Sequence, residues 1–263
     1  MRRKIIFLPL FLCVTFSAVA SIFAQEDPVY SREGNVPILL TAPHAGRPDR
    51  LLPNVPVRSG KDVRTRWDIN TDIITKLTAE HLEKKYHIVP YVVMAKFSRK
   101  SVDVNREANK AYETPAAKPI YDQYHGTVRN YVVQIKRLFG SGILLDIHGQ
   151  ELKNDVIWRG TRHGETIRNL LQTHGWSALV REDGILGFLQ SRGYRIYPNG
   201  VEDSEVPYEG GYTVSTYGSD AGGIDALQLE IGGSFRLRAA ACQKFSEDFA
   251  SAIHHFYLRV LKK

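Results

Sequence analysis

Histidine and acidic side chains stand in this sequence at places where an ordinary hydrophobic core needs neither. His44 follows the apolar run 36–41, and the small residues after it leave room for a metal ion or a substrate. His148 and Glu230 end or interrupt two further apolar runs. Burying an imidazole or a carboxylate is costly unless the group has a partner, so these positions indicate a reactive site. For His44 taken alone, a hydrogen-bonded loop histidine is the alternative.

The segment 143–149 places two polar side chains on one face of a predicted strand. Successive side chains of a strand alternate between faces, so Asp146 and His148 project to the same side. An imidazole nitrogen is suited to bind a metal ion while the carboxylate orients neighbouring groups. A buried Asp–His hydrogen bond with a purely structural role is the alternative.

Glu230 lies between Leu229 and Ile231, where a plain core strand would hold another aliphatic residue. A carboxylate buried there is expected to have either a raised pKa or a cationic partner. A raised pKa is the property of a general base that works near neutral pH.

A basic segment at 98–106 supplies the donors that such a site would need. Arg99, Asn105 and Arg106 carry planar donor groups of the kind that bind carboxylates or stabilise an oxyanion. A solvated charged loop is the alternative for this segment.

These side chains need an α/β framework to bring them together. Buried strands are predicted at 36–41, 87–94, 142–147 and 226–231. Helical spacing of apolar residues predicts helices at 68–85, at 120–138 and from 239 onward. This order favours one α/β domain with a mixed, mainly parallel sheet and helices on both faces. Reactive groups in such sheets gather at the carboxyl ends of the strands.

The N-terminus has the pattern of an export signal. Three basic residues precede an apolar run and a small-residue stretch, so residues 1–24 are expected to be a signal peptide and 25–263 the catalytic domain. Cleavage after Ala20 is an alternative, as is an uncleaved anchor. The expected location is therefore periplasmic or extracellular, without stable membrane insertion after cleavage. Only Cys242 then remains, which excludes an intramolecular disulfide.

Removal of residues 1–24 lowers the formal net charge from +7 to +4, because it takes away three basic and no acidic residues. The remaining lysines and arginines are dispersed among acids, so a small molecule or peptide is the expected partner rather than a nucleic acid.

Several motifs in a fixed order resemble the N-formylglutamate amidohydrolase family, and more distantly aspartoacylase and the zinc carboxypeptidases. They are PHAG at 43–46, SRKSVDVNR at 98–106, LLDIHG at 144–149, GGYTVSTYG at 210–218 and LQLEI at 227–231. The resemblance covers about residues 36–235 and implies a zinc-carboxypeptidase-like (phosphorylase/hydrolase-like) fold.

The resemblance also implies roles for individual residues. His44 and His148 match zinc ligands, and Glu230 matches the catalytic carboxylate. Arg99 matches the arginine that polarises the scissile carbonyl, and Asn105 with Arg106 match the pair that grips the substrate's α-carboxylate. In the glycine-rich stretch, Tyr217 and its neighbour Tyr212 are candidates to close over the substrate.

One ligand position departs from the carboxypeptidase pattern. In those relatives a glutamate follows the first histidine by three residues, but here that position holds Arg47, which cannot bind zinc. The amidohydrolase family has a carboxylate shortly before the first helix, and Asp68 is at the matching place. A helix N-cap is the alternative role for Asp68, and Asp49 is the reserve ligand.

The function implied is a secreted amidohydrolase with one zinc ion per chain. It would cleave an N-acyl amino acid or a short peptide amide that carries a free carboxylate. A non-catalytic binding protein on the same fold is one alternative. A serine hydrolase is another, although Ser219 lacks the Gly-x-Ser-x-Gly turn that such enzymes place after a strand.

Overall fold

Strands from distant parts of the chain lie side by side in one seven-stranded sheet. The computed structural model describes residues 27–61 and 63–262. The strands are β1 (Val29–Arg32), β2 (Ile38–Ala42), β3 (Tyr91–Ala95), β4 (Ile143–Gln150), β5 (Val156–Gly160), β6 (Arg195–Tyr197) and β7 (Asp225–Gly232). Their order across the sheet is β1-β3-β2-β4-β7-β5-β6.

The four strands predicted from the sequence are the four neighbours at the centre of this sheet. Strands β3, β2, β4 and β7 run parallel to one another, while β1 pairs with β3 antiparallel and β5 pairs with β7 antiparallel. Strand β6 runs parallel to β5. The predicted mixed, mainly parallel α/β sheet is therefore confirmed. The strands that the sequence reading missed, β1, β5 and β6, lie at the two sides of the sheet.

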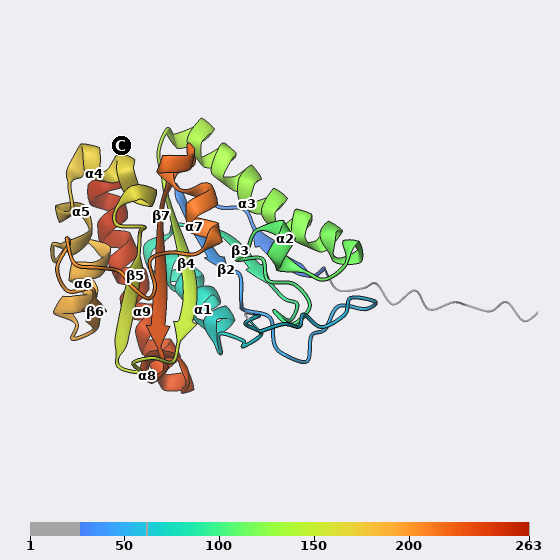
Figure 1. The fold of residues 1–263 in the computed structure, drawn as a ribbon. Helices are drawn as coiled ribbons and strands as arrows, with labels where there is room; N and C mark the ends of the chain where they lie inside the picture. Colours follow the sequence, from blue (N-terminus) through green and yellow to red (C-terminus); the bar gives the residue numbers. More distant parts are fainter. Residues whose placement is uncertain (1–26, 62, 263) are drawn as a thin grey trace, which may run out of the picture.

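Helices cover both faces of the sheet (Figure 1). They are α1 (Thr71–Tyr86), α2 (Ala108–Ala111), α3 (Lys118–Phe139), α4 (Arg168–His174), α5 (Ser177–Val180), α6 (Ile185–Ser191), α7 (Tyr212–Tyr217), α8 (Gly233–Arg236) and α9 (Ala239–Phe256). Alternate residues of the central strands pack into two different buried apolar clusters. Leu40 and Leu145 pack in the cluster that includes residues of α1 and α9. Leu39 and Leu144 pack in the cluster on the side of α3 and α7.

Helix α1 begins at Thr71, three residues later than the sequence predicted. The reason is Asn70, which takes a left-handed backbone conformation with φ of 64° and so interrupts the helical path. Asn70, and not Asp68, is the N-cap residue, and no side-chain capping bond forms there. Asp68 therefore lies before the helix, with its carboxylate free to serve another purpose.

The expected signal peptide at residues 1–24 lies outside the described residues. Within residues 27–61 and 63–262, no helix combines the length and the apolar character that crossing a membrane requires. Cys242 is a buried free thiol on α9.

Candidate metal centre and its cleft

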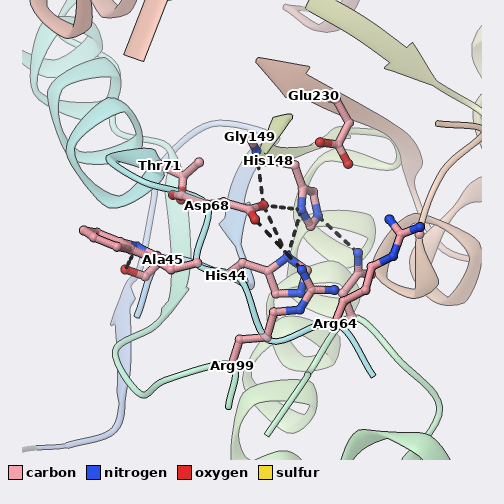
Figure 2. A network of polar contacts seen from close by, with 12 residues as sticks. His44, Ala45, Arg64, Asp68, Thr71, Arg99, His148, Gly149 and Glu230 are labelled. Carbon is pink, nitrogen blue, oxygen red and sulfur yellow. Dashed lines mark hydrogen bonds and ion pairs between the residues drawn. The ribbon is translucent and has the colours of Figure 1, made fainter. Parts of the chain in front are cut away.

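His44, Asp68 and His148 come together at the carboxyl edge of the parallel strands. His44 lies just after β2, Asp68 lies just before α1, and His148 is part of β4. Their exposed fractions are 3%, 7% and 2%, so all three are buried. Figure 2 shows their side chains pointing toward one another, with Glu230 beside His148. Among the residues that the structure describes, these three side chains form a group whose ligand atoms lie close enough together to hold a metal ion.

One atom from each of the three side chains faces the same small volume. The Nδ1 atoms of His44 and His148 lie 3.1 Å apart. The Oδ2 atom of Asp68 lies 3.3 Å from Nδ1 of His44 and 3.0 Å from Nδ1 of His148. The backbone N–H of Gly149 donates to the same oxygen at 3.1 Å, which fixes the orientation of the Asp68 carboxylate.

The far nitrogen of each imidazole faces a buried carboxylate. Nε2 of His44 lies 2.7 Å from Oδ1 of Asp103, and Nε2 of His148 lies 3.0 Å from Oδ2 of Asp146. An ionised carboxylate can only accept a hydrogen bond, so each Nε2 carries the proton. In the neutral rings both Nδ1 atoms then present lone pairs to each other and to the oxygen of Asp68. A positive charge at that point removes the repulsion between these lone pairs and the carboxylate oxygen.

The arrangement fits a divalent metal ion. Two imidazole nitrogens and one carboxylate oxygen form a typical three-ligand set for catalytic zinc, and carboxylates behind the histidines are a regular feature of such sites. The pKa values agree with a site built for positive charge. Burial would raise the pKa of Asp68, but His44 and His148 hold it well below its usual range. Burial would lower the pKa of His148, but Asp146 and Asp68 raise it well above the usual value.

Asp103 is itself held by several donors. Nε of Arg99 donates to its Oδ2 at 2.8 Å, and Nη1 of Arg58 lies 3.6 Å from the same oxygen. The backbone N–H of Asn105 donates to its Oδ1 at 3.1 Å. Although burial alone would raise the pKa of Asp103, His44 and these cations lower it. Asp103 therefore stays ionised and keeps His44 in the tautomer that directs Nδ1 at the centre. The sequence reading missed this role, although Asp103 lies within one of the motifs.

Glu230 lies on β7 directly opposite His148 on β4. Its Oε1 accepts a hydrogen bond from Nε2 of Gln228 at 3.0 Å. No arginine or lysine of residues 27–61 and 63–262 forms an ion pair with it, so the alternative of a cationic partner does not describe this carboxylate. Burial raises the pKa of Glu230 to about 7, against the opposing effect of His148. A carboxylate with this pKa can accept and release protons near neutral pH.

A cleft of about 770 Å³ opens over these residues. The predicted residues Arg99, Asn105 and Arg106 line it, together with His44, Asp68, His148 and Glu230. The Asn105 carbonyl oxygen is engaged already, because it accepts from the backbone N–H of Thr213 at 2.8 Å. The Arg106 side chain is 45% exposed and is available to a ligand.

Tyr217 does not line this cleft, contrary to the expectation that it contacts substrate. It is buried on α7, where its hydroxyl lies 2.9 Å from Nδ1 of His125 and donates to the backbone oxygen of that residue at 3.0 Å. The reason is the path of the chain, because α7 turns the side chain of Tyr217 toward α3. Gly210 and Gly211, just before the helix, are the residues of this stretch that reach the cleft.

Tyr208 is the tyrosine that lines the cleft. Its ring packs edge-on against Trp158 with centroids 5.4 Å apart, and Trp158 is paired with Glu230 across β5 and β7. Burial and the charge of Glu230 raise the pKa of Tyr208. The sequence offered no periodic signal for Tyr208, because it belongs to an irregular segment.

A buried ion pair anchors that irregular segment. Nη1 of Arg159 donates to Oε1 of Glu205 at 3.0 Å, and both side chains are almost fully buried. The Glu205 carboxylate also accepts from the backbone N–H groups of Thr161 and His163. Glu205, which these bonds hold in place, therefore anchors the chain three residues before Tyr208 in the wall of the cleft.

Two alternatives from the sequence do not match the structure. Asp49 is 64% exposed at its side chain and pairs with Arg47, so it is not part of the buried group. Ser219 donates to the backbone oxygen of Thr166 at 3.2 Å. No histidine among the described residues is bonded to it, and it does not line the cleft.

Comparison with solved structures supports the fold. No family model matches the sequence, and no curated protein matches it. The crystal structure of N-formylglutamate amidohydrolase from Ralstonia eutropha JMP134 aligns with a TM-score of 0.63 at 17% identity, covering 89% of this chain and 99% of that one. A gene product from Agrobacterium tumefaciens aligns with a TM-score of 0.57 at 14% identity, covering 89% and 96%. The chain thus shares its fold with an N-formylglutamate amidohydrolase, which confirms at the level of the fold the resemblance that its motifs indicated.

Proposed function

We propose that this chain is a zinc-dependent amidohydrolase that cleaves an N-acyl amino acid or a short peptide amide with a free carboxylate. The observation that carries the proposal is the convergence of His44, Asp68 and His148 beside Glu230 at the floor of one cleft. Each imidazole is backed by its own buried carboxylate, as ligands of a metal ion usually are. The likeness to an N-formylglutamate amidohydrolase in fold is consistent with this chemistry.

The bound zinc ion would supply Lewis acidity for a water molecule and for the amide carbonyl. Glu230 is the proposed general base: it accepts the proton of the attacking water and passes it to the nitrogen of the leaving amine. Its pKa of about 7 suits both steps. Arg99 is the proposed second catalytic residue. Asp103 holds its guanidinium in place, which prepares it to stabilise the negative charge that develops on the carbonyl oxygen.

Arg106 is the proposed binding partner of the substrate's carboxylate. It lines the cleft, half exposed, and its Nε lies 3.9 Å from Asp103, too far for a hydrogen bond that would occupy it. Asn105 supports the same subsite by holding the start of α7, since its Oδ1 accepts from the backbone N–H of Thr213, rather than by offering a free carbonyl. Tyr208 takes the place over the cleft that the sequence reading gave to Tyr217.

The proposed location is outside the cytoplasm, with residues 1–24 as a cleaved signal peptide and a mature chain from residue 25. The basis is the charged, apolar and small-residue order of the N-terminus. We propose small molecules or peptides as partners, rather than nucleic acids or membranes.

Metal removal tests the proposed function directly. Purified protein is assayed against a panel of N-acyl amino acids and short peptides, then treated with a chelator, dialysed and given zinc again. Hydrolysis that is lost with the chelator and returns with zinc supports the proposal. Hydrolysis that survives complete removal of metal contradicts it, and inhibition by a fluorophosphonate would point instead to a serine hydrolase.

A further inference from the structure

Arg236, the last residue of α8, is a buried cation that lies outside all of the sequence motifs. Its exposed fraction is 1%. Its guanidinium donates to three backbone oxygens: Nε to Ile231 at 3.0 Å, Nη1 to Ile69 at 3.0 Å and Nη2 to Gln150 at 3.1 Å. Among the described residues, no carboxylate forms an ion pair with it. Burying a guanidinium is costly, whereas an apolar side chain of similar size would fill the same space without that cost.

The three backbone oxygens belong to the segments that form the metal centre. Ile69 follows Asp68, and Ile231 follows Glu230. Gln150 is the second residue after His148 at the end of β4. One planar group thus ties together the two strand ends and the turn before α1.

Two further contacts join Arg236 to the same place. Its backbone oxygen accepts a hydrogen bond from Nδ2 of Asn70 at 2.7 Å, which holds the left-handed turn after Asp68. A Cβ atom on Gly149 would lie 2.6 Å from Nε of Arg236, so a glycine is required beside His148 for the guanidinium to fit. Burial lowers the pKa of Arg236, and the charges of Asp68 and Glu230 oppose that effect.

We propose that Arg236 is a positioning residue that fixes the backbone of Asp68, His148 and Glu230 in the geometry that binds the metal ion. This inference rests on the proposed metal site. It differs from a general role in stability because it assigns to Arg236 an effect on metal affinity that another buried arginine does not have.

Arg159 provides the matched control. It is as deeply buried as Arg236, with 2% exposure, and it bonds two backbone oxygens as well as Glu205. Its partners hold the segment near Tyr208 and include none of the metal-centre segments. Both Arg236→Met and Arg159→Met are expected to lower the thermal midpoint. Only Arg236→Met is expected to weaken zinc binding, by about 10- to 100-fold in Kd measured by chelator competition, while Arg159→Met stays within about threefold of wild type.

Hydrogen exchange of the metal-free protein tests the same inference without the metal. Arg236→Met is expected to speed exchange together at 68–70, 149–151 and 231–233, whereas Arg159→Met speeds it at 159–164 and 200–208. The exchange measurement distinguishes failure of the proposed function from failure of the positioning role of Arg236. A wild-type chain that binds no zinc overturns the proposed function. Faster exchange at all three segments in Arg236→Met still shows whether Arg236 holds them.

If Arg236→Met does not fold, Arg236→Lys replaces it, because one ammonium cannot reach all three oxygens in the planar geometry of the guanidinium. Weaker zinc binding in that variant supports the inference, and faster exchange at the three segments together identifies the loss of backbone positioning as its cause. Zinc affinity equal to wild type, or an equal loss of affinity in the Arg159 variant, overturns it.

Discussion

The Nδ1 atoms of His44 and His148 lie 3.1 Å apart, and each ring's other nitrogen faces a buried carboxylate. This relationship determines what the site can hold. With both Nε2 atoms protonated, two lone pairs and the oxygen of Asp68 meet at one point, and a cation is the natural occupant.

Asp68 is expected to be the third metal ligand. In Asp68→Asn the charge is lost while the shape is kept, so zinc content is expected to fall from about one ion per chain to a small fraction. Asp49→Asn is the control, because Asp49 is exposed and is expected to leave the metal content unchanged. Elemental analysis of the purified variants decides the matter, and a zinc-free Asp49→Asn protein would require a different ligand set.

The carboxylates behind the histidines are expected to tune metal affinity. Asp103→Asn and Asp146→Asn each remove a charge that fixes one imidazole, so the zinc Kd is expected to rise about 10- to 100-fold. Asp225→Asn is the matched control, since Asp225 is also buried but bonds the backbone of Leu170 instead. Competition with a chromophoric chelator measures all three variants. Unchanged affinity in both of the first two would show that the histidines need no such support.

Two tyrosines are expected to separate catalysis from stability. Tyr208→Phe removes a hydroxyl from the cleft and is expected to raise KM or lower kcat with little change in thermal midpoint. Tyr217→Phe breaks the hydrogen bond to His125 and is expected to cost about 1 kcal/mol of stability with near-normal turnover. Steady-state kinetics and thermal unfolding check both variants. A loss of turnover confined to Tyr217→Phe would restore the role that the sequence suggested for it.

The sequence predicted the location of the site residues best where polar residues interrupt apolar strands. His148 and Glu230 are of this kind, because a strand's periodicity shows both the burial and the face of each side chain. Asp68 could be assigned only through the resemblance, since its place before α1 is decided by the left-handed turn at Asn70. Tyr208 could not be predicted, because tertiary hydrogen bonds rather than periodicity place its irregular segment.

The stability of the fold is expected to depend on pH through His125. Burial lowers the pKa of His125 to about 4, compared with about 6.5 in an unfolded chain. The unfolded state therefore binds more protons between these values, and the stability contribution is complete above pH 6.5 and lost as the pH falls toward 4. The full contribution is on the order of 3 kcal/mol.

Denaturant unfolding of metal-free protein at pH 7 and pH 4.5 measures this effect. The loss of stability between the two pH values is expected to be smaller in His125→Phe than in wild type. Equal losses in both proteins would mean that folding does not change the pKa of His125.

Glu230→Gln tests the central claim most directly. The glutamine keeps the shape, and its amide oxygen can still accept the bond from Gln228, so zinc content and thermal midpoint are expected to stay near wild type. The proton-accepting charge is gone, so kcat on a confirmed N-acyl substrate is expected to fall by on the order of a hundredfold or more. The measurement is kcat per bound zinc ion in wild type and variant. A Glu230→Gln protein that binds zinc and retains full turnover would contradict the mechanism.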